Sequence, residues 1–236
     1  MTEQPTTLAG VPALAVSKAP PEEAAATRGT VLLFHGFTGS KEVQRTEAFS
    51  LARRGYLAIT PDAVGHGARR FADFDRRFPP DLADRNYFEV VQQTADELPS
   101  LIAELQERRW ALPGRLGACG ISMGGAVLFG AIASGCAFGA AAAIVASPVW
   151  RHRPFSPHER LDRFFPVPLL LQNASADEVV NPAEARALCE ALAPRYASAP
   201  ERLRYFLHSG EGHMFSERGW HRAWGEVEAW FDRFLR

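Results

Sequence analysis

The sequence has few cysteines, no long apolar run and no excess of charge of one sign. Its three cysteines, Cys119, Cys136 and Cys189, are scattered through 236 residues and form no C-x-x-C pair. This pattern argues against a disulfide framework and against a structural zinc site. No apolar run approaches the roughly 18 residues that a membrane-spanning helix needs. The N-terminus shows no basic segment followed by an apolar one, so we predict no signal peptide and expect a cytoplasmic protein.

The near-absence of net charge disfavours two classes of partner. The chain has 26 Lys and Arg against 27 Asp and Glu, a formal net charge of −1. Proteins that bind nucleic acid usually carry a clear basic excess. Attachment to anionic membranes also depends on basic clusters. We therefore expect neither nucleic acid nor a membrane as a partner.

Short apolar runs alternate with helical patterns from residue 30 onward. The predicted strands are residues 30–34, 56–60, 116–121, 140–146, 167–172 and 203–207, and the predicted helices are 42–54, 87–109, 124–134, 182–193 and 219–235. Pro99 predicts a kink or a break in its helix. The alternation is typical of an α/β fold with a mostly parallel, doubly wound sheet and helices on both faces. We expect one domain over residues 30–236, with residues 1–29 forming a strand or hairpin and a linker packed on it.

Two irregular stretches, residues 65–88 and 148–166, interrupt the alternation and are rich in arginine and phenylalanine. Both are too short for a lid domain, so we expect small cap segments only. The arginines are open to two interpretations: they hold an acidic leaving group such as coenzyme A, or they form a solvated face beside nearby aspartates. The second is favoured because charged runs on loops are usually exposed.

A strand-to-helix turn carries the first chemical signal. Gly120-Ile121-Ser122-Met123-Gly124 matches the G-x-S-x-G pattern, with a predicted strand before the serine and a predicted helix after it. In such a nucleophile elbow the serine is pushed outward in a strained conformation, and the flanking glycines avoid backbone clashes. Ser122 is therefore the candidate nucleophile. The alternative is a glycine-rich turn with an inert serine, and Cys119 beside it is interpreted as a small buried core residue.

A serine nucleophile needs a histidine as general base within hydrogen-bond reach. Active sites of open α/β sheets lie beyond the carboxyl ends of the strands. Three histidines come after the last predicted strand: His208, His213 and His221. His208 stays at the strand end and His221 falls within the final helix. His213 lies in a flexible Gly-x-Gly-His turn, and we predict it to be the base.

The base in turn needs a carboxylate that orients its ring. Asp177 lies in a polar loop that follows the strand 167–172 and opens the next helix. It is the predicted acid, with the neighbouring Glu178 as the alternative. A purely structural interpretation of Asp177 is a charge that satisfies amide groups at a helix N-terminus.

The loop after the first buried strand reads His35-Gly36-Phe37-Thr38-Gly39-Ser40. Its glycines allow backbone N–H groups to approach a ligand closely. We expect the Phe37 N–H, together with the Met123 N–H, to bind the negative charge that develops on a substrate oxygen. His35 itself is expected to be structural, because it precedes the loop.

Five segments in this order resemble the α/β-hydrolase superfamily: HGFTGS, PDAVGHGAR, GISMGG, SADEVVNP and GEGHMF. Their spacing is most similar to compact bacterial esterases of the dienelactone-hydrolase and prolyl-oligopeptidase-like branch. The resemblance implies that Ser122, Asp177 and His213 form the triad, that Phe37 and Met123 form the oxyanion hole, and that no metal or organic cofactor is needed.

Dienelactone hydrolases usually carry cysteine as nucleophile, so Ser122 favours ordinary ester hydrolysis. We expect a small-molecule ester as substrate, with contacts from Phe37, His66, Val180 and Phe215. Asp62 and His66 are interpreted first as residues that shape their loop. A thioesterase, a peptidase or a carbon–carbon hydrolase on the same triad is the alternative. A non-catalytic binding protein would lack a triad member, and the sequence lacks none.

Overall fold

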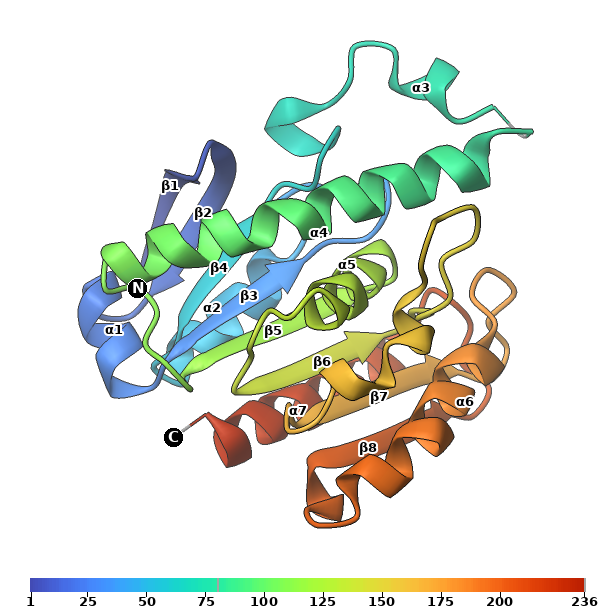
Figure 1. Ribbon diagram of the computed structural model, residues 1–236. Helices are drawn as coiled ribbons and strands as arrows, with labels where there is room; N and C mark the ends of the chain where they lie inside the picture. The colour runs from blue at the N-terminus through green and yellow to red at the C-terminus, as the bar shows by residue number, and fades with distance from the viewer. Residues whose placement is uncertain (80, 236) are drawn as a thin grey trace.

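One β-sheet organises the chain and brings the carboxyl ends of six parallel strands to a common edge. The computed structural model describes residues 1–79 and 81–235. Within them the sheet has eight strands in the order β1-β2-β4-β3-β5-β6-β7-β8 (Figure 1). Strands β3 to β8 run parallel, while the β1–β2 hairpin is antiparallel and joins β4 in the antiparallel sense. The predicted mostly parallel sheet is confirmed.

The observed elements lie close to the predicted ones. The strands are β1 (Thr2–Leu8), β2 (Val11–Ser17), β3 (Thr30–Phe34), β4 (Leu57–Pro61), β5 (Leu116–Ile121), β6 (Ala140–Ile144), β7 (Leu169–Ala174) and β8 (Leu203–His208). The helices are α1 (Pro21–Thr27), α2 (Arg45–Arg53), α3 (Phe74–Arg77), α4 (Ala83–Glu107), α5 (Met123–Ala133), α6 (Pro182–Leu192) and α7 (Glu217–Phe234). β3 and β5 have the predicted bounds, and most other ends differ by a few residues.

Both faces of the sheet are buried, because successive side chains of a strand point to opposite sides. In β3, Leu32 and Phe34 join the core beneath α4, α5 and α6. Val31 and Leu33 join a second core beneath α2 and α7. Helices therefore cover both faces, as predicted (Figure 1). Continuous apolar strands of this kind are typical of a parallel sheet buried on both sides.

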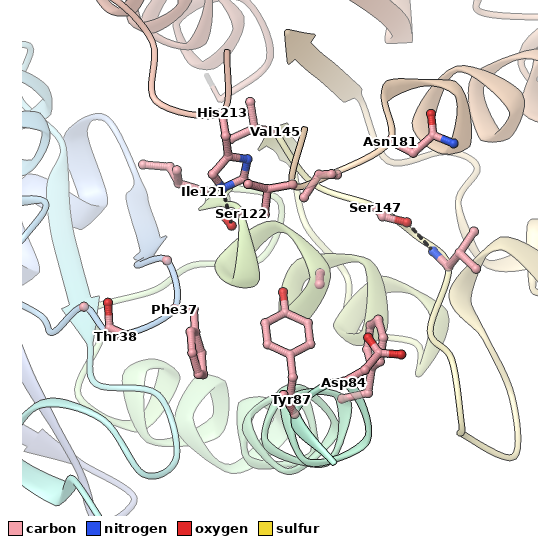
Figure 2. A pocket seen from close by; sticks show the side chains of 18 of the residues that line it. Phe37, Thr38, Asp84, Tyr87, Ile121, Ser122, Val145, Ser147, Asn181 and His213 are labelled. Carbon is pink, nitrogen blue, oxygen red and sulfur yellow. Dashed lines mark hydrogen bonds between the residues drawn. The ribbon is translucent and has the colours of Figure 1, made fainter. Parts of the chain in front are cut away.

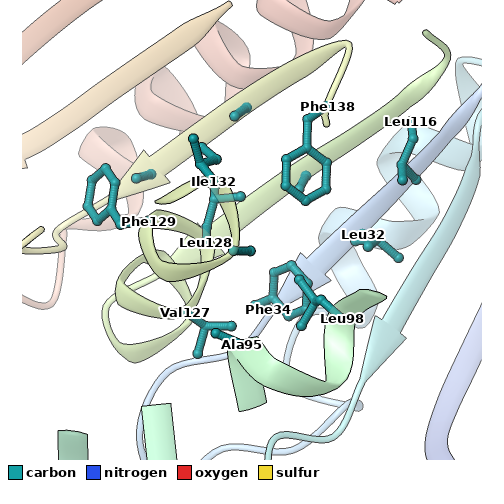
Figure 3. Close-up of a cluster of buried hydrophobic side chains, with 14 of the residues drawn as sticks. Leu32, Phe34, Ala95, Leu98, Leu116, Val127, Leu128, Phe129, Ile132 and Phe138 are labelled. Carbon is teal, nitrogen blue, oxygen red and sulfur yellow. The ribbon is translucent and has the colours of Figure 1, made fainter. Parts of the chain in front are cut away.

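Small residues let α5 approach the centre of the sheet closely (Figure 3). β6 consists of four alanines and an isoleucine. A Cβ atom on Gly125 would lie 2.3 Å from the Ala146 side chain, and one on Gly130 would lie 2.2 Å from the Trp150 ring. Because α5 has no room to move, the turn at its N-terminus, which carries Ser122, is fixed in position.

α4 is one continuous helix through Pro99, where the sequence predicted a kink or two helices. A proline inside a helix costs about 3 kcal/mol because it removes a hydrogen bond and clashes with the preceding turn. Pro99 itself is exposed, while Leu98 and Leu101 on either side are buried in the core. Burial of the apolar face on both sides of the proline offsets this cost. The helix also begins at Ala83, four residues before the predicted start, which brings its first turns to the site described below.

The linker expected within residues 1–29 contains a helix, α1, over Pro21–Thr27. Proline at the first helical position, acidic Glu22 and Glu23 in the first turn and three alanines all favour a helix. Ala24 and Ala25 are buried against the sheet. The predicted N-terminal hairpin is present as β1 and β2, which extend the sheet beside β4.

Candidate active site

Ser122 occupies a strained turn between β5 and α5. Its φ of 54° and ψ of −115° lie outside the regions that residues with side chains usually adopt. A Cβ atom on Gly120 would lie 2.1 Å from the Gly124 carbonyl oxygen, and one on Gly124 would lie 2.1 Å from the Phe34 carbonyl oxygen. Both glycines are therefore required by the backbone, and the turn projects the serine beyond the sheet edge.

Ser122, His213 and Asp177 lie in a hydrogen-bonded row. The Ser122 Oγ lies 3.0 Å from His213 Nε2 (Figure 2). The His213 Nδ1 lies 2.9 Å from Asp177 Oδ2. A carboxylate accepts hydrogen bonds, so Nδ1–H is the donor and Nε2 is left to accept the serine proton. The structure thus brings together the three residues that the sequence singled out.

The Asp177 side chain is fully buried. Its Oδ1 accepts hydrogen bonds from the Val179 and Val180 backbone N–H groups at 2.9 and 2.8 Å. These two bonds orient the carboxylate and leave Oδ2 for His213. Glu178, the alternative acid, is exposed, and the histidine pairs with Asp177 instead. The order of residues after β7 therefore puts Asp177, rather than its neighbour, in the row.

The loop that carries Asp177 is joined by hydrogen bonds to the loop that carries His213. The Ser175 N–H donates to the His208 carbonyl at 3.0 Å, and the Ala176 N–H donates to the Glu211 carbonyl at 2.9 Å. The Gly210 N–H donates to the Ser175 hydroxyl at 2.9 Å. Asp177 and His213 are thereby held at a fixed separation by backbone hydrogen bonds between their loops.

Glu211 anchors the histidine loop to the last helix. Its carboxylate accepts hydrogen bonds from the Ser216 N–H at 2.7 Å and from the Ser216 hydroxyl at 2.9 Å. The bond from the Ser216 N–H lowers the pKa of Glu211. Ser216 also caps α7, because its hydroxyl accepts from the Gly219 N–H at 3.0 Å. The short loop around His213 is therefore closed at both ends.

His35 and His208, two further histidines near the strand ends, have structural partners. The His35 Nε2 accepts from the Ala63 N–H at 3.0 Å, so its Nδ1–H donates to the Gly36 carbonyl at 2.8 Å. Burial lowers the pKa of His35. The His208 Nε2 lies 2.8 Å from the Gln172 side-chain oxygen. Neither ring contacts Ser122, in agreement with the structural role expected for His35.

Asp62 connects the loop after β4 with the loop after β3. Its buried carboxylate accepts hydrogen bonds from the Lys41 N–H at 2.7 Å and from the Ala68 N–H at 2.9 Å, and it pairs with Lys41 Nζ at 3.0 Å. A Cβ atom on Gly67, whose φ is +55°, would lie 1.9 Å from this carboxylate. Asp62 therefore shapes the backbone around Phe37.

A cavity of about 840 Å³ opens beside Ser122 and His213 (Figure 2). Its wall combines apolar side chains with a few polar ones: Phe37, Val43, Phe78, Tyr87, Phe88, Ile121, Val145, Val149, Val179, Val180 and Met214, with Thr38, Gln44, Asp84, Ser147, Arg151, Asn181 and Glu184. Both irregular stretches contribute to it, the first through Phe78 and the start of α4, the second through Val149 and Arg151. The volume suits a small organic molecule.

Of the four residues expected to contact a substrate, Phe37 and Val180 line the cavity, whereas His66 and Phe215 do not. His66 is fully buried beside the Phe37 ring, 5.4 Å away, and burial lowers its pKa to about 4. Phe215 packs against the His208 ring at 5.1 Å. His66 thus packs behind the Phe37 loop, on its buried side. Phe215 points away from the cavity, although its neighbour in sequence, Met214, lines it.

Sequence reasoning missed several cavity residues, above all Tyr87 and the exposed rim of Val43, Val179 and Met214. Three of the most exposed large apolar side chains in the described part of the chain form this rim, at 64%, 72% and 87% exposure. Apolar residues that stand between polar residues in a predicted loop are a signal that the sequence does offer. The predicted helix starts at residue 87, whereas α4 starts at Ala83, so the prediction did not place Tyr87 within the first turns of the helix.

Backbone strain is concentrated around the cavity. Within residues 1–79 and 81–235, six residues other than glycine have positive φ, and three of them, Thr38 at 65°, Ser122 at 54° and Val145 at 44°, line the cavity. A β-branched residue such as valine is rarely found in this region. Strain of this kind persists where the surrounding structure enforces it, and it clusters at functional sites.

The profile of a known family covers almost the whole chain, matching residues 14–235. The chain belongs to the dienelactone hydrolase family. The expected branch of the α/β hydrolases is thereby confirmed. Among curated relatives, Esterase YjfP of Escherichia coli (strain K12) is 35% identical over 100 residues, which are 42% of this chain and 38% of YjfP. YitV of Bacillus subtilis (strain 168), named as a proposed esterase, is 24% identical over 263 residues and 97% of each chain.

Solved structures show the same architecture for this member of the dienelactone hydrolase family. TT1662 from Thermus thermophilus superposes with a TM-score of 0.79 at 27% sequence identity, over 98% of this chain and 99% of that one. The fold is therefore that of the α/β hydrolases. In the part of the chain that the structure describes, no helix has the length and apolar character needed to cross a bilayer.

Proposed function

We propose that this protein is a serine hydrolase that cleaves carboxylic esters through an acyl-enzyme intermediate. The observation that carries the proposal is the row from Ser122 Oγ to His213 Nε2, at 3.0 Å, and from His213 Nδ1 to Asp177 Oδ2, at 2.9 Å, beside a cavity of about 840 Å³. The family and the esterase names among its relatives support the same class of reaction.

In the proposed reaction the Ser122 oxygen attacks the acyl carbon while His213 Nε2 takes its proton. The tetrahedral intermediate collapses, the carbon–oxygen bond to the alcohol breaks, and His213 gives the proton to the leaving oxygen. Water, deprotonated by His213, then attacks the acyl-enzyme and releases the acid and the free serine. Asp177 keeps the imidazole in the required tautomer and stabilises its positive charge.

The backbone N–H groups of Phe37 and Met123 are the proposed donors to the developing oxyanion. Phe37 lines the cavity, and Met123 is the first residue of α5. Within the described residues, neither N–H donates to a protein acceptor. The first N–H groups of a helix have no partner in the helix itself, which suits them to bind an anion. A donor of this kind contributes about 3–4 kcal/mol to transition-state stabilisation.

The paired arginines disfavour an acyl-coenzyme A thioester as the substrate. Arg69 pairs with Glu97, Arg70 with Asp75, Arg77 with Asp73, and Arg151 with Glu184. These partners leave four of the arginines, among them Arg151 of the cavity wall, compensated within the protein, whereas recognition of a phosphorylated group depends on available cations. The apolar wall and rim instead support an uncharged ester of small or medium size.

Replacing Ser122 tests the proposal directly. With a p-nitrophenyl ester of a short acid, Ser122→Ala should lower kcat/KM by about 10⁴-fold or more, because the nucleophile is lost. Ser134→Ala, at the exposed C-terminal end of the same helix, is the matched control and should retain the wild-type rate. Retained hydrolysis by the Ser122 variant would refute the assignment.

A leaving-group series separates ester hydrolysis from the other reactions that the same residues support. The oxygen ester, the thioester and the anilide of one acyl group are compared on the wild-type protein. We expect the highest kcat/KM for the oxygen ester. A preference for the anilide would point to peptide hydrolysis instead, and a preference for the thioester to a thioesterase.

A further inference from the structure

The charged side chains in the cavity wall are already paired within the protein. Glu184 accepts a hydrogen bond from the Ser147 hydroxyl and lies 3.3 Å from the Arg151 guanidinium. Asp84 lies 3.2 Å from His152 Nε2. A charged group on the substrate would have to displace one of these partners. The wall is therefore suited to an uncharged ligand.

Tyr87 differs from these residues, because its hydroxyl makes no hydrogen bond to any residue in 1–79 or 81–235 and is reached by solvent at the cavity wall. Figure 2 shows the hydroxyl pointing away from α4 into the cavity, towards the side on which Ser122 lies. Thr38 and Asn181 also line the cavity, but both are exposed residues that water can solvate. Tyr87 is half-buried, so its hydroxyl is a donor left for a ligand.

The position and the protonation state of Tyr87 are both fixed. Its ring packs edge-on against the Phe37 ring, with 5.7 Å between the centroids, and against the Phe88 ring at 5.0 Å. α4 is anchored along its length by buried apolar residues. Burial raises the pKa of Tyr87, with a further contribution from Asp84. The phenol therefore stays protonated and serves as a hydrogen-bond donor in a fixed place.

We propose that Tyr87 is a specificity-determining residue whose hydroxyl donates a hydrogen bond to an uncharged acceptor oxygen of the substrate, separate from the ester being cleaved. The substrate class is then an oxygen-bearing neutral ester, such as an ether, hydroxy or keto ester, rather than a plain alkyl ester. This inference rests on the proposed ester hydrolysis. An alkyl chain that covers this half-buried donor removes its hydrogen bond to water and offers none in return, which is the physical basis of such discrimination.

The test compares substrates that carry an ether oxygen at different positions of the acyl chain. p-Nitrophenyl esters of straight-chain acids are compared with analogues in which one methylene group at successive positions is replaced by an ether oxygen. For each pair, the ratio of kcat/KM between oxa and alkyl ester is measured for wild type and for Tyr87→Phe. Comparing the two ratios cancels the greater chemical reactivity of the oxa esters.

We expect one oxygen position at which Tyr87→Phe lowers this ratio by about 5- to 10-fold, the value of one net hydrogen bond. Alkyl esters should change by less than about twofold. Tyr205→Phe is the matched control: it removes a hydroxyl that donates to the Pro182 carbonyl outside the cavity, and it should leave every ratio unchanged.

Two results would overturn the proposal. If the ratio is the same in wild type and Tyr87→Phe at every position, the hydroxyl does not bind a substrate oxygen. If Tyr87→Phe lowers kcat equally for all esters, the hydroxyl acts on the reacting carbonyl and not on a second oxygen.

A binding measurement separates failure of this inference from failure of the proposed reaction. Dissociation constants of the same esters are measured by calorimetry for Ser122→Ala and for Ser122→Ala combined with Tyr87→Phe. Tighter binding of one oxa ester that depends on Tyr87 would support the inference even if the wild type hydrolyses none of the esters. If the wild type hydrolyses the esters and neither measurement depends on Tyr87, only the inference falls.

Discussion

The Asp62 carboxylate holds Lys41 at two points, accepting from its backbone N–H at 2.7 Å and pairing with its Nζ at 3.0 Å. Lys41 ends the loop that carries Phe37. One buried carboxylate after β4 therefore fixes the backbone that supplies a proposed oxyanion donor, although Asp62 itself lies outside the cavity wall.

Asp62→Asn should lower kcat more than it raises KM. In the wild type, Asp62 Oδ2 accepts from the Ala68 N–H and the Lys41 ammonium. An amide NH₂ in that place is itself a donor, so neither group would have an acceptor there. We expect kcat to fall by roughly tenfold and the free energy of unfolding to fall by about 1–3 kcal/mol, the cost of an unsatisfied buried group. Ester kinetics and urea denaturation measure the two effects. Asp96→Asn, on the exposed side of α4, is the control, and an unchanged kcat in Asp62→Asn would contradict this role.

Asp177→Asn tests the choice between two neighbouring acids. The asparagine keeps the shape of the side chain but loses the charge that stabilises the imidazolium, and its NH₂ group favours the wrong histidine tautomer. We expect kcat to fall by about 10⁴-fold. Glu178→Gln is the matched control, because Glu178 is exposed. The kcat of this variant should stay within about twofold of the wild-type value, since changes at exposed positions usually have small effects. A larger effect in Glu178→Gln than in Asp177→Asn would reverse the assignment of the acid.

The strand ends and the meeting of Ser122, His213 and Asp177 could be predicted because each of these segments has a local signal in the sequence. β5 and the Ser122 elbow follow from an apolar run and two glycines. Asp177 and His213 follow from polar loops placed after strands. All of these signals are short-range, and the fold only has to bring the strand ends together.

The wall of the cavity could not be predicted in the same way, because it depends on packing between distant segments. Tyr87 lies on the first turns of α4, which begins at Ala83, four residues before the predicted start. His66 lies in a motif beside Asp62, and only the turn of that loop decides that its ring points inward. Side-chain direction at a loop is set by tertiary contacts that a single sequence does not display.

Gly120→Ala should disrupt the elbow, while Gly225→Ala should stabilise the protein. A methyl group on Gly120 would lie 2.1 Å from a backbone oxygen, so the turn must shift and both activity and stability should fall. Gly225 lies in α7 with nothing within 4 Å of its added methyl group. Alanine in a helix is favoured over glycine by about 0.5–1 kcal/mol. Thermal unfolding of both variants checks the opposite signs, and a shift of the same sign in both would contradict this explanation.

Stability should fall in acid partly through His66. Burial lowers the pKa of His66 to about 4 in the folded protein, from an ordinary value of 6.5. Between these values the unfolded chain binds more protons, so this contribution is fully present above about pH 6.5 and is lost as the pH falls towards 4. His35 and His208, whose pKa values are also lowered by burial, act in the same direction.

Denaturation of wild type and His66→Asn between pH 7 and pH 4 isolates this contribution. The variant is expected to be less stable at neutral pH, because it loses buried ring contacts. Its free energy of unfolding should nevertheless fall less steeply with acid than that of the wild type. Parallel curves for the two proteins would show that His66 is not the group responsible.

The hydrogen bonds between the loops after β7 and β8 have a consequence for how this enzyme class can diversify. Asp177 and His213 belong to one structural unit, whereas Ser122 belongs to another, the elbow between β5 and α5. Replacing the proposed nucleophile Ser122 should therefore leave the hydrogen bond between His213 and Asp177 undisturbed. Such modularity gives a physical route by which either a serine or a cysteine at position 122 could be served by the same scaffold.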